Sequence, residues 1–300
     1  MAAPDVAKHR AAAKRRLASF RESAEPDRKA ALNWRNRTIT PFRSVYTDGL
    51  ALRTPVHPFG GGMKIDLLVI AAHPDDAELT SGGTLLKAAA ARYRTGILDL
   101  TRGETGTRGT PEVRLREAAR AAKILGVRVR RNLGLPDAHL RVCDEYKAAI
   151  AEVIRELEPR TVILPYWEGR HPDHYAAAAL GYEACFIAGL KRYALAGQPF
   201  RPAKILYAAA YAQVRPTFVV DITEYYDRRR RAIFAYASQF RPPKSEQSSR
   251  VPIPLDELEE RMGLQARSYG LMIGVRYAEG YVVKEVMKVD DVVNMPVRSL

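Results

Sequence analysis

The sequence predicts a single α/β domain with a Rossmann-like, mostly parallel sheet flanked by helices. From Met63 onward, strand-like apolar runs alternate with helix-like runs, which is the pattern of βαβ units around a buried parallel sheet. The 300 residues, 47% of them hydrophobic, suffice for one sizeable core. Two His-Pro-Asp segments each follow a strand-like run, and open α/β sheets bind ligands beyond the carboxyl ends of their strands.

The expected strands and helices alternate along most of the chain. Strands are predicted at 65–71, 95–100, 127–133, 161–165, 205–210 and 217–221, and helices at about 80–93, 112–125, 143–157, 174–190 and 222–238. A further helix at 254–268 and strand-like material around 271–289 follow. The helix at 112–125 has the clearest ends, because Thr110 can cap it, Pro111 suits its first turn and Gly126 can close it.

Residues 1–62 differ in character from the rest of the chain. They hold 12 Lys/Arg against 5 Asp/Glu and show no sustained periodicity. We interpret them as a disordered extension that precedes a domain at 63–300, or as a sign that translation starts at Met63. A targeting peptide is a minor alternative, since the stretch is rich in arginine but contains acids. His9 and His57 lie in this extension and have no visible role.

The net charge of +14 invites a comparison with nucleic-acid-binding proteins. The basic clusters are Lys14–Arg16 and Arg228–Arg231, and the second lies in an expected helix, where a solvated face is the ordinary explanation. The interleaving of basic and aromatic residues that is typical of single-strand binders is absent. We therefore expect no nucleic-acid partner, unless the basic extension acts as an arm.

The composition also indicates a compartment. No apolar run approaches the ~18 residues of a membrane span, and the first ~30 residues lack the apolar core of a signal peptide. Cys143 and Cys185 lie in helix-like segments without a CxxC partner, which favours free thiols in a reducing compartment. We expect a cytoplasmic protein that does not associate with membranes.

The two His-Pro-Asp segments contain the residues best suited to chemistry. They are His73-Pro74-Asp75-Asp76 and His171-Pro172-Asp173-His174. Two such segments can meet at one edge of one sheet, where they supply three histidines and three aspartates. A catalytic zinc site usually has three protein ligands and one open position. His73, Asp76 and His174 would form such a set for one Zn²⁺ per chain, and Fe²⁺ or another divalent ion could replace it.

The remaining residues of the two segments suit acid–base catalysis. Asp75 is adjacent to a ligand and can accept the proton of a metal-activated water. His171 is a candidate acid for the leaving group, and Asp173 could hold its imidazole in one tautomer. For either segment alone, a turn with a capping aspartate is the ordinary alternative, but two such segments after two strands favour a metal site. His139 lies near a plausible site loop and receives no assigned role.

These residues also resemble a known family. Ala72–Asp76 followed by Gly82-Gly83, together with His171–His174, is similar to the signature of the LmbE-like zinc deacetylases, which remove acetyl from N-acetylglucosamine (GlcNAc) units. The resemblance extends from about Met63 to about Val292. Three further stretches resemble the branch that deacetylates N-acetylglucosaminyl-malate in bacillithiol biosynthesis: Leu135–Asp137, Tyr236–Phe240 and Gly274–Gly280.

The resemblance implies roles for individual residues and for the whole chain. It matches the zinc ligands to His73, Asp76 and His174, the general base to Asp75, and a general acid or oxyanion helper to His171. It matches a substrate-contacting arginine to Arg114 and an aspartate that binds sugar hydroxyls to Asp137. An arginine one turn into a helix could grip a carboxylate through two bonds, although a helix-surface arginine is the alternative. A small amino-sugar substrate and a homo-oligomer are also implied.

Two details refine this interpretation. The glycine-rich stretch Thr101–Thr110 lacks the GxxxxGK[ST] and GxGxxG arrangements of nucleotide sites, so we expect it to shape the substrate pocket, with Glu104 and Arg108 as contacts. Members of the bacillithiol branch commonly carry an active-site tyrosine after Ser-Gln-Phe, but Ser245–Met262 contains none. Tyr269 would then have to reach the site, or His171 and the metal would do more.

The sequence thus predicts a zinc-dependent hydrolase that removes acetyl from an N-acetylglucosaminide, with N-acetyl-α-D-glucosaminyl L-malate as the expected substrate. A deacetylase of a different GlcNAc conjugate is the closest alternative. A non-catalytic, metal-stabilised binding protein is disfavoured, because a structural zinc site has no use for a spare base.

Overall fold

The computed structural model describes residues 64–212, 214–241 and 255–297, which all belong to one compact unit. The predicted extension at 1–62 and the alternative start at Met63 lie outside the described residues.

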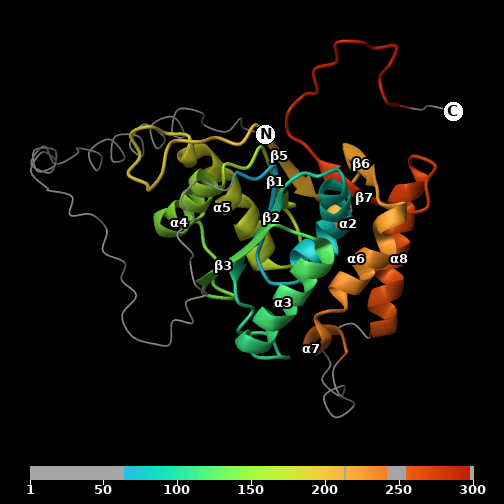
Figure 1. Ribbon diagram of the computed structural model, residues 1–300, viewed down its shortest axis with the longest axis horizontal. Coiled ribbons are helices and arrows are strands. Elements are labelled where there is room, and N and C mark those ends of the chain that lie inside the picture. The colour runs from blue at the N-terminus through green and yellow to red at the C-terminus, as the bar shows by residue number, and fades with distance from the viewer. Residues whose placement is uncertain (1–63, 213, 242–254, 298–300) are drawn as a thin grey trace, which may run out of the picture. The chain divides into compact units, whose positions relative to one another are not determined.

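A seven-stranded sheet forms the centre of this unit (Figure 1), in the order β3-β2-β1-β4-β5-β7-β6. Its strands are β1 (Leu67–Ala71), β2 (Thr95–Thr101), β3 (Val129–Leu135), β4 (Thr161–Pro165), β5 (Lys204–Ala208), β6 (Phe218–Asp221) and β7 (Ala278–Val282). Neighbouring strands from β3 to β5 run parallel, whereas β7 pairs antiparallel with both β5 and β6. The prediction of a mostly parallel sheet is confirmed.

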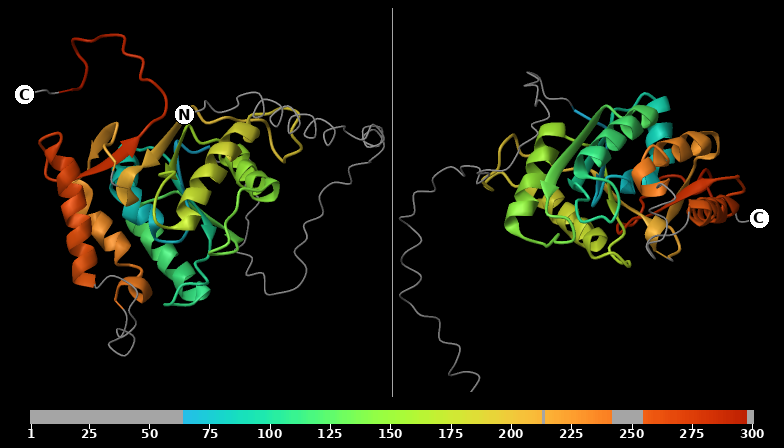
Figure 2. Two further views of the ribbon diagram at one scale, coloured as in Figure 1. Left: turned by 180° about the vertical axis from the view of Figure 1, so that it is seen from behind. Right: turned by 90° about the horizontal axis from the view of Figure 1, so that it is seen from below.

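Helices cover both faces of the sheet (Figures 1 and 2). One face packs against α4 (Asp144–Leu157) and α5 (Pro172–Ala188), and the other against α2 (Asp76–Ala90), α3 (Pro111–Leu125) and α6 (Tyr226–Ile233). Helix α8 (Leu255–Leu271) packs against β6 and β7. Three short helices complete the described elements: η2 (Ala209–Tyr211), η3 (Thr223–Tyr225) and α7 (Ala237–Phe240).

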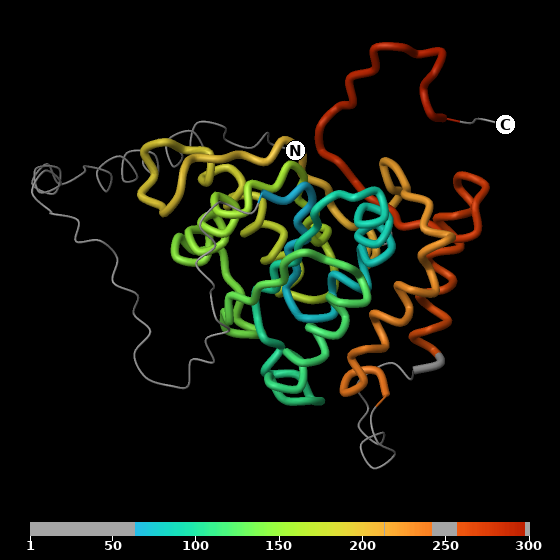
Figure 3. Tube along the Cα trace, viewed as in Figure 1, coloured from blue at the N-terminus to red at the C-terminus, as the bar shows by residue number. Residues whose placement is uncertain are grey.

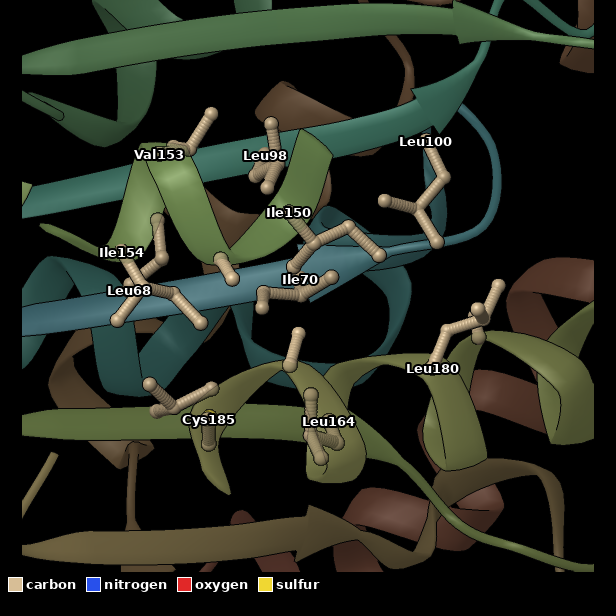
Figure 4. Close-up of a cluster of buried hydrophobic side chains, with 14 of the residues drawn as sticks. Leu68, Ile70, Leu98, Leu100, Ile150, Val153, Ile154, Leu164, Leu180 and Cys185 are labelled. Carbon is tan, nitrogen blue, oxygen red and sulfur yellow. The ribbon is translucent and has the colours of Figure 1, made fainter. Parts of the chain in front are cut away.

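The position of β1 in the middle of the sheet explains why its sequence is continuously apolar. Leu68 and Ile70 join the buried cluster beneath α4 and α5, which Figure 4 shows in close-up. Leu67 and Val69, which point the opposite way along the pleat, join the cluster beneath α2. Because both faces are covered, every residue of β1 is buried.

Several predicted boundaries are wrong. Helix α2 begins at Asp76, not near residue 80, and α5 begins at Pro172, where proline presets the first helical φ. Asp76, Asp173 and His174 therefore lie in the first turns of helices and not in loops. The helix expected at 222–238 is divided into η3, α6 and α7, and the material at 271–289 supplies only β7 as a strand.

The strand order reverses direction between β1 and β4. Strands β2 and β3 lie on one side of β1, while β4 and β5 lie on the other. At such a switch point, open α/β sheets bind ligands beyond the carboxyl ends of the strands. Because the two His-Pro-Asp segments follow β1 and β4, the topology places them side by side.

Beyond β7, the described chain continues as an irregular segment that leads away from the sheet (Figure 3). Val286 and Val293 in this segment are almost fully exposed. Among the described residues, no helix combines the length and apolar character needed to cross a membrane.

Candidate metal centre and active site

Four strands bring the candidate residues together at their carboxyl ends. The segment His73–Asp76 follows β1, Asp137 follows β3, and Asp173 and His174 open α5 after β4. Tyr211 ends the short helix η2 that follows β5. Since β1 and β4 are neighbours in the sheet, the ring centroids of His73 and His174 lie only 5.4 Å apart.

Asp76 joins these two histidines. Its Oδ2 lies 3.2 Å from Nδ1 of His73, and its Oδ1 lies 3.2 Å from Nε2 of His174. Zinc binds nitrogen and oxygen at about 2.0–2.1 Å in a tetrahedron, which places neighbouring ligand atoms about 3.3 Å apart. Asp76 therefore contacts both predicted histidine ligands, through a different oxygen for each, at distances close to that spacing.

Two further carboxylates contact the other ring nitrogen of His73. Its Nε2 lies 3.0 Å from Oδ1 of Asp137 and 3.2 Å from Oδ2 of Asp173. Within the described part of the chain, two groups of three residues have ligand atoms within 4.8 Å of one another. One consists of His73, His171 and His174, and the other of His73, Asp137 and Asp173.

Asp137 and Asp173 also accept bonds from the backbone of neighbouring loops. Oδ2 of Asp137 accepts the N–H of Thr105 at 2.9 Å and its hydroxyl at 2.7 Å. Oδ2 of Asp173 accepts the N–H of Ala138 at 2.8 Å, and its Oδ1 accepts that of Leu140 at 3.3 Å. These bonds fix both carboxylates against His73, as carboxylates commonly orient ligating histidines.

Both contact patterns differ from the roles expected from the sequence. Asp137, expected to bind sugar hydroxyls, is buried and directed at His73. Asp173, expected to orient His171 through its carboxylate, instead orients His73, and only its backbone N–H donates to Nδ1 of His171. The reason is that Asp173 lies in the first turn of α5, where its N–H faces the capping residue.

The electrostatic environment of His73 strongly favours positive charge. Burial by itself lowers the pKa of the His73 imidazole, but hydrogen bonds to three carboxylates outweigh it and raise the pKa to about 12. Burial likewise acts to raise the pKa of Asp76, but the charges and hydrogen bonds of His174 and His73 hold it well below its ordinary value. The carboxylates around His73 therefore stabilise positive charge at this centre.

Asp75 occupies the N-cap of α2 in a strained conformation, with a φ of 112°. Residues other than glycine rarely adopt a positive φ, and such strain is concentrated at functional sites. Burial raises the pKa of the Asp75 carboxyl to about 7, although the Arg114 guanidinium opposes the shift. A carboxyl group that titrates near neutrality suits a general base.

Arg114 holds this candidate base. Its Nη2 donates to Oδ2 of Asp75 at 3.0 Å and to the carbonyl of Pro74 at 2.6 Å, and its Nη1 donates to the carbonyl of Gly103 at 3.2 Å. A Cβ on residue 103, whose φ is +67°, would lie 1.9 Å from Nη1 of Arg114, so only glycine fits there. Arg114 is buried. It is therefore not the surface arginine of the alternative interpretation, and its contact with substrate stays a prediction.

His171 caps α5 at the exposed side of the centre. Its ring stacks on that of His174 with centroids 4.7 Å apart. Partial desolvation, reinforced by the positive charge of the two neighbouring histidines, lowers the pKa of His171. An accessible imidazole beside the ligands can exchange a proton with a reacting group.

Tyr211 is a site residue that the sequence interpretation missed. Its hydroxyl donates to Oδ1 of Asp76 at 3.1 Å, and its ring stacks on His174 with centroids 4.7 Å apart. Tyr269, which we expected to reach the site, instead donates to the carbonyl of Ala209 at 3.1 Å and so supports the helix η2 that carries Tyr211. The position of Tyr211 just after a predicted strand was the available signal.

The other predicted contacts lie in the surrounding loops. Glu104 accepts the N–H of Asp137 at 2.9 Å, so it fixes the loop that carries Asp137. The carbonyl of Arg108 accepts a bond from the Gln239 side chain. His139 is exposed, and its Nδ1 lies 2.8 Å from the carbonyl of Asp137. Among the described interactions, none of these three side chains contacts His73, Asp76 or His174.

Comparisons with known proteins agree with this arrangement. The family profile described as PIG-L, GlcNAc-PI de-N-acetylase, matches residues 68–185. The diacetylchitobiose deacetylase of Thermococcus kodakarensis is 35% identical over 240 residues, which cover 74% of this chain and 84% of that protein. A probable N-acetyl-alpha-D-glucosaminyl L-malate deacetylase of Bacillus anthracis is 29% identical, with 58% of this chain and 81% of that protein covered.

A solved structure is similar as well. The crystal structure of a conserved protein from Thermus thermophilus matches with a TM-score of 0.69 and 41% identity, and covers 75% of this chain and 98% of that one. The match with the Thermococcus enzyme spans most of both chains at an identity that identifies a family. This chain therefore belongs to the PIG-L, or LmbE-like, family, and it is a deacetylase, a hydrolase that cleaves amide bonds.

Proposed function

We propose that this chain is a zinc-dependent deacetylase of a GlcNAc glycoside, and that His73, Asp76 and His174 hold the metal. The observation that carries the proposal is the meeting of Asp76 with both histidines at 3.2 Å. We favour this set over His73, Asp137 and Asp173, because Asp76 contacts both histidines, whereas the latter two carboxylates contact His73 alone. Asp137 and Asp173 then orient the His73 ring through its other nitrogen, Nε2.

Each residue around the metal has a separate role in the proposed reaction. A divalent cation held there would lower the pKa of a bound water and polarise the substrate carbonyl. Asp75 takes the proton of the attacking water, and Arg114 keeps its carboxylate in place. His171 stabilises the oxyanion and delivers a proton to the nitrogen as the amide C–N bond breaks. The products are acetate and the free amine of the sugar.

For the substrate, we propose a GlcNAc conjugate with an anionic aglycone, of which N-acetylglucosaminyl-malate is the leading example. Three arginines support it, and they lie on the loops that follow β2 and β4: Arg102, Arg108 and Arg170. Because Arg114 is engaged by Asp75, we assign the pairing with a substrate carboxylate to one of these three. The Bacillus anthracis relative supports the same substrate.

Diacetylchitobiose is the second candidate, and the 35% identity with the Thermococcus kodakarensis enzyme favours it. It carries no charge, so it needs no arginine. The expected homo-oligomer and the expected cytoplasmic location remain predictions.

Acetate release decides between these substrates. The zinc-loaded full chain is offered N-acetylglucosaminyl-malate, diacetylchitobiose and free GlcNAc in parallel. Release from the malate conjugate alone supports the anionic aglycone, whereas faster release from diacetylchitobiose overturns it in favour of the second candidate. If zinc binds and no acetate appears from any of the three, the proposed function is wrong in its substrate class.

A further inference from the structure

A buried ion pair contacts the middle of helix α2. Arg229 of α6 and Glu279 of β7 form it, with Nε and Oε1 3.1 Å apart and side chains only 4% and 3% exposed. Both residues lie beyond the 68–185 segment that the family profile matches. Charged side chains are rarely buried so fully unless they have specific partners.

The partners of this ion pair include backbone groups of α2. In a regular α-helix, the N–H of Gly83 donates to the carbonyl of Leu79, four residues earlier. Here Oε1 of Glu279 accepts the N–H of Gly83 at 2.8 Å, and Nη2 of Arg229 donates to the carbonyl of Leu79 at 2.6 Å. Oε2 of Glu279 also accepts the N–H and the hydroxyl of Thr84, at 2.8 and 2.7 Å. The ion pair thus contacts both the donor and the acceptor of one i→i−4 pair of α2, the N–H of Gly83 and the carbonyl of Leu79.

The Gly82-Gly83 pair makes this contact possible. A Cβ on residue 82 would lie 3.0 Å from Cγ of Arg229, and a Cβ on residue 83 would lie 2.7 Å from Ile222. Paired glycines and inserted side chains are the usual places where a helix can bend. The first turns of α2 therefore depend on the ion pair, as well as on the helical ladder, for their direction.

The first turn of α2 carries the chemistry. Asp75 is its N-cap and Asp76 its first residue, and Nε of Arg229 also contacts the carbonyl of Glu78 at 3.4 Å. We propose that Arg229 and Glu279 are positioning residues, which fix the first turn of α2 and so place Asp76 between the two histidines. This inference rests on the proposed function in one respect, that Asp76 is a metal ligand.

Three variants of the full chain test the inference. Glu279→Gln keeps the shape of the side chain and removes its charge. Arg229→Lys keeps the charge but has one donor nitrogen in place of the two, Nε and Nη2, that contact Glu279 and Leu79. Should either leave an unpaired buried charge that prevents folding, the double change Arg229→Met with Glu279→Leu removes both charges together. Zn²⁺ affinity is measured by competition with a chromophoric chelator, and hydrogen exchange is measured by mass spectrometry on peptides covering 73–84.

Arg155→Lys is the matched control. Arg155 is equally buried but lies on α4, on the opposite face of the sheet, where it donates to the carbonyls of Ala188, Leu190 and Leu195 at 2.8–2.9 Å. The loss of a buried arginine far from the site should lower the melting temperature of Arg155→Lys. It should leave the Zn²⁺ affinity and the hydrogen exchange of peptides covering 73–84 unchanged.

We expect the Glu279 and Arg229 variants to bind Zn²⁺ about 10- to 100-fold more weakly, the usual range for residues that orient metal ligands. Exchange should accelerate in the first turns of α2 and remain unchanged in α4. Affinity and exchange equal to those of Arg155→Lys would overturn the inference. If the wild-type chain binds no Zn²⁺, the proposed function fails, and the exchange of the metal-free protein still decides whether the ion pair fixes the first turn of α2.

Discussion

Asp75 combines a positive φ, a largely buried carboxyl group and an ion pair with Arg114. We predict that Asp75→Asn retains Zn²⁺ binding and lowers kcat by about 10²–10⁴, the usual contribution of a general base. Asparagine tolerates the positive φ better than most residues, so the fold should be retained. Acetate release and metal content are measured on the same preparation.

Asp290→Asn is the control for this prediction, because Asp290 is an exposed aspartate paired only with Lys288 among the described residues. It should leave kcat unchanged. An Asp75→Asn variant with the turnover of this control would remove Asp75 from its role as the base.

The two cysteines should differ sharply in reactivity. Burial raises the pKa of the Cys185 thiol to about 12, whereas Cys143 is only partly buried at the start of α4. Because the thiolate is the nucleophile and Cys185 lies in the core, iodoacetamide at pH 8 should label Cys143 in the native protein and leave Cys185 unmodified. A Cys143→Ser variant that is still labelled without denaturant would contradict the prediction.

Helix α3 shows how far local sequence signals specify an element. Thr110 accepts the N–H of Val113 at 3.3 Å, Pro111 is the first helical residue, and Gly126 ends the helix at a φ of 73°. The sequence predicts all three. We expect Thr110→Ala to lower the free energy of unfolding by about 1 kcal/mol, the typical value of an N-cap. Urea unfolding measures it, and Thr110→Ser, which keeps the acceptor oxygen, should lose less.

Helix α2 shows where local signals are insufficient. Its first turn contains Asp76, Ala77 and Glu78, and both acidic residues are buried. Glu78 is buried because Arg130 of β3 pairs with it at 2.5 Å, and Arg130 pairs in turn with Asp99 of β2 at 2.8 Å. The hydrophobic periodicity of the sequence places such acids in a loop, because it carries no information about a partner 52 residues away. This is why the sequence predicts a start about four residues too late.

At the scale of the whole molecule, the metal centre links segments that follow β1 and β4. A ligand that binds only the folded state at 100 times its Kd stabilises that state by about 2.7 kcal/mol. For a unit of this size, about 1 kcal/mol corresponds to 2–4 °C. We therefore predict that saturating Zn²⁺ raises the melting temperature by about 5–10 °C and that a chelator reverses the change. His73→Ala should show no Zn²⁺-dependent shift, and an equal shift in that variant would place the metal elsewhere.

The sequence by itself determined the α/β class, the order of most elements and the two His-Pro-Asp segments, because hydrophobic periodicity and turn residues are local properties. The family followed from the same residues. Only the tertiary structure decided which side chains face one another. It directed Asp137 and Asp173 toward His73, engaged Arg114 with Asp75, and brought Tyr211 to Asp76. The physical reason is that these contacts join the ends of strands far apart in the sequence, and their partners are selected by the strand order of the sheet.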